Sequence, residues 1–205
     1  MKQRFHRVLA ALLLAASASP LMAAEPPLPG DSVYQAQAVV TDQSGRTQPW
    51  QDLRGRPTVV SMFYANCHLM CPLIIASGKA LQSRLPAEER AGLDFAMISI
   101  DPARGTPAGL MGGAQEHRVD LGPWHLLRPA DADVRTLAAA LGIRYRAQPD
   151  GTFNHTGALI LLDKDGRIVA RSEVTDLQPD AEFVAAVHEH LSGSRRAAAS
   201  PATSR

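Results

Sequence analysis

The chain has 205 residues, enough for one domain with a proper core and short for two. Hydrophobic residues make up 45% and charged residues 20%, the proportions of an ordinary soluble protein. The formal net charge of +1 conceals an acidic body, because both chain ends (1–24 and 192–205) are basic and carry no acid. An acidic body with few aromatic residues lacks the basic, aromatic surface that binds nucleic acid, so this class of partner is excluded.

Residues 1–24 are typical of a secretory signal, with a basic start, an apolar centre at 8–16 and small residues after it. Cleavage is expected near Ala23 or Ala24. The alternative is an uncleaved membrane anchor, for which the interrupted apolar stretch is at or below the minimum length. No cysteine lies near the cleavage point, so no lipoprotein is expected. We expect a periplasmic protein, held at the inner membrane if the signal is kept.

The body of the chain begins with a proline- and glycine-rich linker at 25–32. Two strands at 33–41 and 46–50 are predicted to form a hairpin around a turn closed by Gly45. The apolar run 58–64 then predicts a buried strand, because it lacks polar alternation and contains β-branched and aromatic residues.

Strands and helices alternate through the rest of the chain. Apolar spacing predicts helices at 72–85, 107–117, 131–141 and 179–191, and strands at 93–100, 124–127, 157–163 and 167–171. The last two strands form a hairpin, while 143–154 is expected to be irregular and 192–205 a disordered tail. This order predicts one α/β domain over 33–191, with a mixed central sheet, helices on both faces and an N-terminal hairpin.

The chain's two cysteines, Cys67 and Cys71, lie where the strand at 58–64 leads into the helix at 72–85. That position makes the predicted arrangement thioredoxin-like. In helical geometry their side chains share one face, so both sulfurs point at one ion or approach each other closely enough to oxidise. Two thiolates select Cu(I) above all, with zinc an alternative if nitrogen ligands join. A helix N-terminus is also expected to lower the thiol pKa.

A purely structural disulfide is the competing interpretation, since two cysteines in an exported protein most often pair. The loop between these two is too short to remove much chain entropy, which argues against it.

A third ligand has to come from elsewhere, and His155 is the histidine whose position stands out. It follows a flexible segment and directly precedes the apolar strand at 157–163. The other histidines of the body have ordinary explanations, either packing or compensation of a helix dipole: His117, His125, His188 and His190. From the residues alone, His155 is either a ligand or a loop histidine without a role.

Taken together, these motifs resemble the Sco/SenC family of copper-binding cytochrome c oxidase assembly proteins, over roughly residues 33–191. The resemblance rests on motifs that occur in the family's order: Asp42-Gln43-Ser44-Gly45, Asp52-Leu53-Arg54-Gly55, Phe63-Tyr64, Cys67 to Cys71-Pro72, Ser99-Ile100-Asp101-Pro102, Thr106-Pro107, His155 and Asp165-Gly166. It implies a thioredoxin-like fold and copper, as Cu(I), Cu(II) or both, held by Cys67, Cys71 and His155.

The resemblance also implies a function and partners. The expected function is delivery of copper to the dinuclear CuA centre of cytochrome c oxidase, or to a related cuproprotein. Expected partners are the CuA-bearing subunit or another copper acceptor, other periplasmic copper chaperones, and thioredoxin-like reductants.

The chain departs from the family pattern in two places. Family members often have a proline and then an acidic residue after the first cysteine, where this chain has His68-Leu69-Met70. Gly105 replaces the second aspartate of the family's Asp-Pro-x-x-Asp-Thr-Pro loop.

Two functions therefore stay open: a metal carrier, and a thiol–disulfide oxidoreductase that reduces the cysteines of the copper acceptor. The cysteine spacing of four, where that redox chemistry typically has three, favours the carrier. The i,i+4 distance nevertheless stays within disulfide range. The two hypotheses make different predictions for His155, because only the carrier depends on it.

Overall fold

The computed structural model describes residues 26–64, 67 and 70–199. The predicted export signal and the residues His68 and Leu69 between the cysteines lie outside this part. Within it, none of the helices combines the length and the apolar character needed to cross a lipid bilayer.

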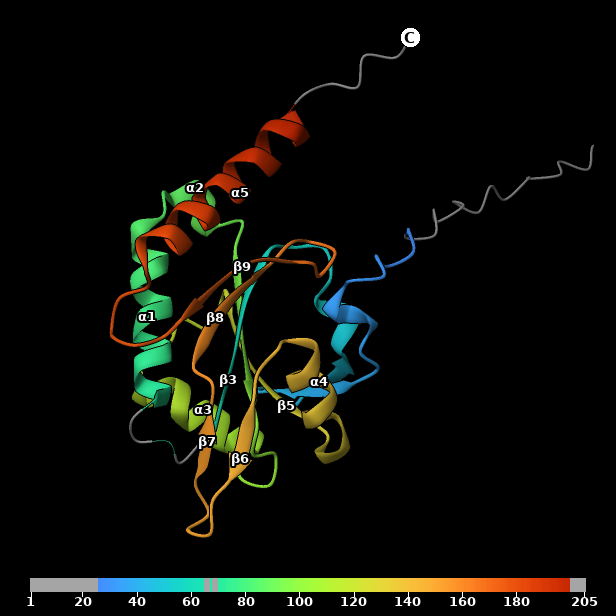
Figure 1. Cartoon of the computed structure of the whole chain (residues 1–205), viewed down its shortest axis with the longest axis vertical. Coiled ribbons are helices and arrows are strands. Elements are labelled where there is room, and N and C mark those ends of the chain that lie inside the picture. Colours follow the sequence, from blue (N-terminus) through green and yellow to red (C-terminus); the bar gives the residue numbers. More distant parts are fainter. Residues whose placement is uncertain (1–25, 65–66, 68–69, 200–205) are drawn as a thin grey trace, which may run out of the picture.

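A seven-stranded mixed sheet forms the centre of the fold, in the order β2-β1-β5-β4-β3-β8-β9 (Figure 1). The strands are β1 (Val39–Asp42), β2 (Thr47–Pro49), β3 (Thr58–Phe63), β4 (Asp94–Ser99), β5 (Trp124–Pro129), β8 (Ala158–Leu162) and β9 (Ile168–Glu173). β3, β4 and β5 run parallel, whereas β8 is antiparallel to β3. Every residue of β3 is buried, as expected of an apolar strand covered on both faces.

Helices cover both faces of this sheet. They are α1 (Met70–Arg84), α2 (Ala87–Arg90), α3 (Pro107–Glu116), α4 (Val134–Ala140) and α5 (Ala181–Ala199), with 3-10 turns η1 (Val33–Gln35), η2 (Trp50–Leu53) and η3 (Asp131–Asp133). Figure 1 shows α1 and α4 on opposite sides of the central strands. The predicted α/β, thioredoxin-like class with its mixed sheet and N-terminal hairpin is confirmed.

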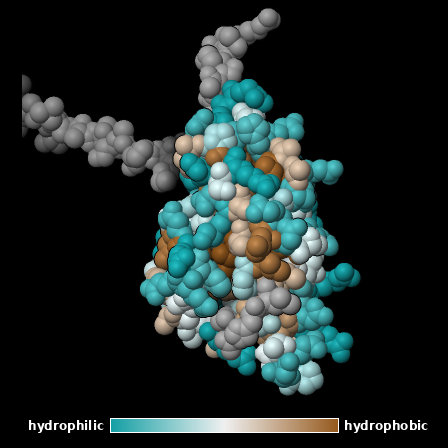
Figure 2. Space-filling model, turned by 90° about the vertical axis from the view of Figure 1, so that its left-hand side faces the viewer, coloured by the Kyte–Doolittle hydropathy of each residue, from teal (hydrophilic) through white to brown (hydrophobic). Residues whose placement is uncertain are grey.

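The surface on the α1 side is mostly hydrophilic, with apolar atoms gathered near its centre (Figure 2). Within the part of the chain that the structure describes, four large apolar side chains are well exposed: Val39, Ile168, Val169 and Leu177. Two of them belong to β9, a strand at the edge of the sheet.

The predicted N-terminal strand at 33–41 is wrong in its first half. Residues 33–35 form the turn η1, and the strand begins only at Val39. Ser32 accepts a hydrogen bond from the Tyr34 N–H, and the Val33 N–H donates to Gly166 O at 2.9 Å. The Ser32 bond caps the 3-10 turn, and the Val33 bond ties the segment to the β8–β9 turn.

The segment predicted to be irregular, 143–154, contains a second small sheet. Strands β6 (Tyr145–Ala147) and β7 (Phe153–His155) pair in antiparallel fashion, and Tyr145 lies opposite His155. The turn between them includes Gly151 with φ +82°, a backbone conformation that glycine adopts without strain. His155 therefore ends a hairpin, which projects at one end of the molecule (Figure 1).

The closing helix was predicted to end at 191, but α5 continues to Ala199. Its extra length is anchored by Glu89 of α2, which is only 1% exposed. Glu89 accepts from His188 Nδ1 at 2.8 Å and from Arg195 Nη2 at 2.7 Å. The predicted disordered tail is thus wrong for 192–199, because a distant carboxylate and good helix formers extend the helix.

A glycine of α1 and a glycine of α3 differ in how closely other atoms pack around them. An ideal Cβ at Gly78 of α1 would lie 2.8 Å from Trp124 Cη2, in a ring stacked on Phe95 at 4.4 Å. An ideal Cβ at Gly113 of α3 meets no heavy atom within 4 Å. Packing therefore requires glycine at 78 but not at 113.

This contrast is testable by denaturant unfolding. Gly113→Ala is expected to raise the free energy of unfolding by about 0.5–1 kcal/mol, because alanine is the better helix former and its methyl group is unobstructed. Gly78→Ala is expected to lower it by about 1–3 kcal/mol through overpacking against the tryptophan. Equal shifts in the two variants would contradict the packing described for the two helices.

Candidate metal centre

The three residues predicted to bind copper come from three separate segments. Cys67 follows β3, Cys71 is the second residue of α1, and His155 is the last residue of β7. The structure brings them together, since their ligand atoms all lie within 4.8 Å of one another. Both cysteines are thiols, 9% and 3% exposed. A group of two sulfurs and one nitrogen is thus assembled across the α1–β7 boundary.

Backbone hydrogen bonds hold the two sulfurs at the start of α1. The Cys71 N–H donates to Cys67 Sγ at 3.1 Å, so the first sulfur accepts from an N–H group at the helix N-terminus. Cys71 Sγ lies 3.4 Å from Tyr64 N and 3.5 Å from Tyr64 O. The end of β3 and the first turn of α1 therefore position both sulfurs through main-chain contacts.

The expected lowering of the thiol pKa is wrong for Cys71. The contact with the Cys67 side chain, followed by burial, raises the pKa of the Cys71 thiol well above its usual value. Two adjacent buried thiolates repel each other and lack water to solvate them. A cation between them would compensate both charges, so the pair is suited to metal rather than to two unpaired thiolates.

His155 presents one ring nitrogen to the protein and keeps the other unsatisfied. Nδ1 lies 3.2 Å from Thr156 O, which favours the tautomer protonated at that nitrogen. Nε2 is buried and has no hydrogen-bond partner among the described residues. A carbonyl on one nitrogen and a lone pair with no hydrogen-bond donor on the other is the usual arrangement of a metal-binding histidine. The residues therefore fit a metal ion.

Aromatic rings fix the orientation of this imidazole. The Tyr64 ring meets His155 edge-on at 5.8 Å between centroids and also contacts Phe153 at 5.3 Å. Tyr64 thus links the cysteine segment to the β6–β7 hairpin. Sequence reasoning did not assign this role, because the contact depends on how the hairpin packs against the end of β3.

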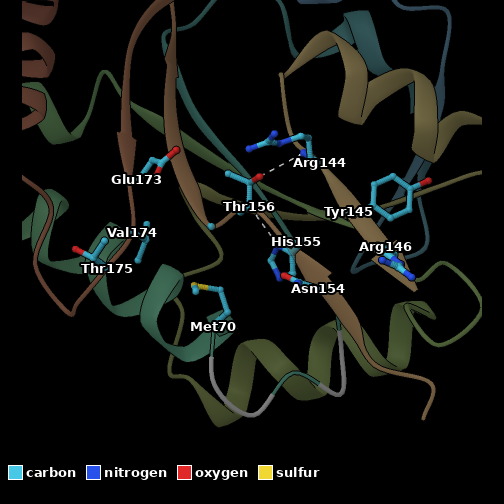
Figure 3. Close-up of a pocket in the computed structure, with 11 residues that line it drawn as sticks. Met70, Arg144, Tyr145, Arg146, Asn154, His155, Thr156, Glu173, Val174 and Thr175 are labelled. Carbon is cyan, nitrogen blue, oxygen red and sulfur yellow. Dashed lines mark hydrogen bonds between the residues drawn. The ribbon is translucent and has the colours of Figure 1, made fainter. Parts of the chain in front are cut away.

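A cavity of about 460 Å³ lies beside His155, between the start of α1 and β6–β7. Figure 3 shows Met70 and His155 facing it from these two elements. The Met70 thioether packs so closely on Gly157 that a Cβ there would lie 2.6 Å from Sδ. Met70 is thus a soft side chain near the centre that secures the segment following His155.

The loop after β4 shows why glycine replaces the family's aspartate. An ideal Cβ at Gly105 would lie 2.8 Å from Ser99 Oγ and 3.2 Å from Asp101 O. The buried Asp101 pairs with Arg104 at 2.6 Å, and Arg104 Nη1 reaches Gly151 O at 3.4 Å. The loop therefore supports the hairpin that carries His155, and its packing leaves no room for a side chain at 105.

The other histidines of the described chain stay outside the Cys67–Cys71–His155 group. His117 follows α3, and its carbonyl accepts from Lys79 Nζ at 3.0 Å. His125 lies within β5 and His188 pairs with Glu89. The sequence predicted that His188 is solvated and compensates a helix dipole. The prediction did not include its contact with the buried carboxylate of Glu89.

Comparison with known proteins identifies the family. Residues 29–192 match the SCO1/SenC family model, so the chain belongs to this family. A protein from Stutzerimonas stutzeri, described as copper-binding, is 28% identical over 137 residues, which are 64% of this chain and 65% of that protein. The chain thus matches somewhat less than two thirds of that relative's length.

Solved structures share the fold at lower identity. Bradyrhizobium japonicum ScoI with copper bound has 23% identity and a TM-score of 0.59, covering 75% of this chain and 97% of that one. BsSco, a Sco family member in which a disulfide switch was identified, has 19% identity and a TM-score of 0.64 over 77% and 95% of the chains. Both comparisons support the thioredoxin-like architecture.

Restoring the family's aspartate is expected to harm this protein. Gly105→Asp should lower the free energy of unfolding by about 1–3 kcal/mol, because its Cβ collides with Ser99. Gly30→Asp makes the same chemical change where an added Cβ meets nothing within 4 Å, and should be nearly neutral. Chemical denaturation measures both variants. A neutral Gly105→Asp would refute the steric explanation.

Proposed function

We propose that this protein is an exported copper carrier that holds one copper ion with Cys67, Cys71 and His155. Its cargo would be delivered to the CuA centre of cytochrome c oxidase or to a related cuproprotein. The observation that carries the proposal is the unpartnered, buried Nε2 of a histidine grouped within 4.8 Å with two thiol sulfurs. An unsatisfied buried nitrogen costs stability unless a ligand occupies it.

The donor set selects the metal. Two thiolates favour Cu(I), and imidazole suits copper in both oxidation states. Binding requires the thiols to lose their protons, so loading with copper releases protons and stabilises the fold. The copper-binding relative from Stutzerimonas stutzeri and the copper-bound ScoI structure support the same cargo.

Release of copper requires exchange of ligands with an acceptor. His155 is well placed to leave first, since it belongs to the two-stranded β6–β7 sheet, whereas the cysteines are fixed to β3 and α1. Delivery to cytochrome c oxidase is supported by BsSco, a member of the Sco family of assembly proteins for that enzyme. The proposed partner is the CuA-bearing subunit, with other periplasmic copper chaperones as copper donors.

We place this function in the periplasm on the basis of the signal-like residues 1–24. The compartment is oxidising, so the two thiols persist there only if a metal holds them or a reductant restores them. A thioredoxin-like reductant is therefore a further proposed partner.

A second function, thiol–disulfide exchange, is favoured by the closeness of the two sulfurs. The disulfide switch in BsSco supports it. In this function Cys67 and Cys71 cycle between dithiol and disulfide while reducing the cysteines of the acceptor. Such chemistry requires both cysteines but not His155.

The carrier is tested by loading the reduced protein with copper. His155→Ala should weaken copper binding by roughly tenfold or more and alter the sulfur-to-Cu(II) charge-transfer band, because one of three ligands is lost. His190→Ala, on α5, is the matched control and should leave stoichiometry and spectrum unchanged. Titration with absorption spectroscopy measures both properties.

The same variants separate the two functions. An unchanged affinity and spectrum in His155→Ala would contradict the three-ligand carrier. If the wild-type protein retains no copper but reduces a protein disulfide in a reaction that survives His155→Ala, the oxidoreductase is the correct function.

A further inference from the structure

A second cavity, of about 310 Å³, borders the cysteine pair and shares no lining residue with the cavity of Figure 3. We name it the α1–α3 slot. Its walls include Cys67, Cys71 and Ile75 on one side and Gly109, Gly112 and Gly113 on the other. Its volume is at the lower end of that of ligand pockets, enough for a few side chains but not for a large cofactor.

Helical spacing explains how the slot is formed. Gly109, Gly112, Gly113 and Glu116 follow the i, i+3, i+4, i+7 pattern, so they occupy one face of α3. Cys71 and Ile75 likewise share one face of α1. The sulfur atoms of the candidate centre therefore border a space whose far wall is a helix surface almost without side chains.

The protein itself explains only one of these glycines. An ideal Cβ at Gly109 would lie 3.0 Å from Arg104 O, a tight contact that favours glycine there. At Gly112 and Gly113 an added Cβ meets no heavy atom within 4 Å. Glycine within a helix lowers stability, and packing in the described chain does not require it at these two positions. These two glycines therefore keep open the space in front of the thiols.

On the His155 side of the centre, which borders the cavity of Figure 3, two packing contacts hold the imidazole and the segment after it. The Tyr64 ring packs against both His155 and Phe153 there, and Met70 packs onto Gly157. An incoming ligand that approaches through the slot meets Cys67 and Cys71, with Tyr64 as a further wall.

We propose that a cysteine-bearing peptide segment of the copper acceptor docks in the α1–α3 slot; this rests on the proposed carrier function. Helix α3 without side chains lets an extended backbone come close, while Ile75, Phe63 and Leu126 offer apolar contact. Glu116 ends α3 and carries a negative charge at one end of the slot, while Arg104 at the other end is paired with Asp101. A basic residue of the docked segment would face Glu116.

The exchange step in the slot is balanced. A thiol of the acceptor loses its proton and its sulfur bonds to copper, while the bond from copper to one cysteine sulfur of this protein breaks. The released sulfur takes up a proton, and the oxidation state of copper does not change.

Filling the slot tests the proposal. Gly112→Leu and Gly113→Leu place a side chain in the slot, whereas Ala108→Leu adds one to the same helix at a residue that does not line it. The whole chain loaded with Cu(I) is mixed with a short synthetic peptide containing two cysteines, and the transfer rate is measured. The two glycine variants should slow transfer by roughly tenfold, the effect of losing one well-packed contact, and Ala108→Leu should match the wild type.

Copper stoichiometry, measured on every variant, keeps this test separate from the carrier function. Equal copper content with slower transfer in only the glycine variants supports docking in the slot. Transfer rates in Gly112→Leu and Gly113→Leu equal to that of Ala108→Leu overturn it.

If the wild type binds no copper, the carrier function fails but the slot is still tested. The reduced chain is then mixed with the peptide activated as a mixed disulfide with thionitrobenzoate. A cysteine sulfur of the protein bonds to the peptide sulfur, and the thionitrobenzoate leaves with the electron pair and is measured by absorbance. Slower release in only the two glycine variants supports peptide docking, and equal release in all variants overturns it.

Discussion

The burial of two thiols and one imidazole nitrogen at a single point is the constraint on which the rest of the structure depends. The contact with Cys67 and burial disfavour ionisation of Cys71. Nε2 of His155 is buried, and no described residue donates a hydrogen bond to its lone pair. The same burial suits this group to a thiophilic metal, as the proposed carrier function requires. The fold brings these three groups together from separate segments.

Two parts of the scaffold position these groups. The cysteines are fixed by a fully buried strand and by hydrogen bonds at the start of α1. His155 comes from a small separate sheet, held by Tyr64 and by the contact of Arg104 with Gly151. For the proposed carrier, placing the two sulfurs and His155 on separate elements suits an ion that is first held and then given up.

Local sequence patterns predicted the parallel strands, the cysteine helix and the class of fold, because apolar periodicity there agrees with the tertiary environment. They missed β6–β7, whose three-residue strands contain polar residues and depend on a turn at Gly151. They ended α5 early, since its extension depends on Glu89, about a hundred residues away. The raised pKa of Cys71 and the ring contacts of His155 also depend on packing. The grouping of His155 with the two cysteines could therefore be predicted only from the structure or from the family resemblance.

X-ray absorption at the copper edge, on the protein loaded with one equivalent of Cu(I), tests the central claim most directly. The account predicts a first shell of two sulfur atoms and one nitrogen atom, the donors of Cys67, Cys71 and His155. A first shell made only of sulfur, or only of nitrogen and oxygen, would contradict it.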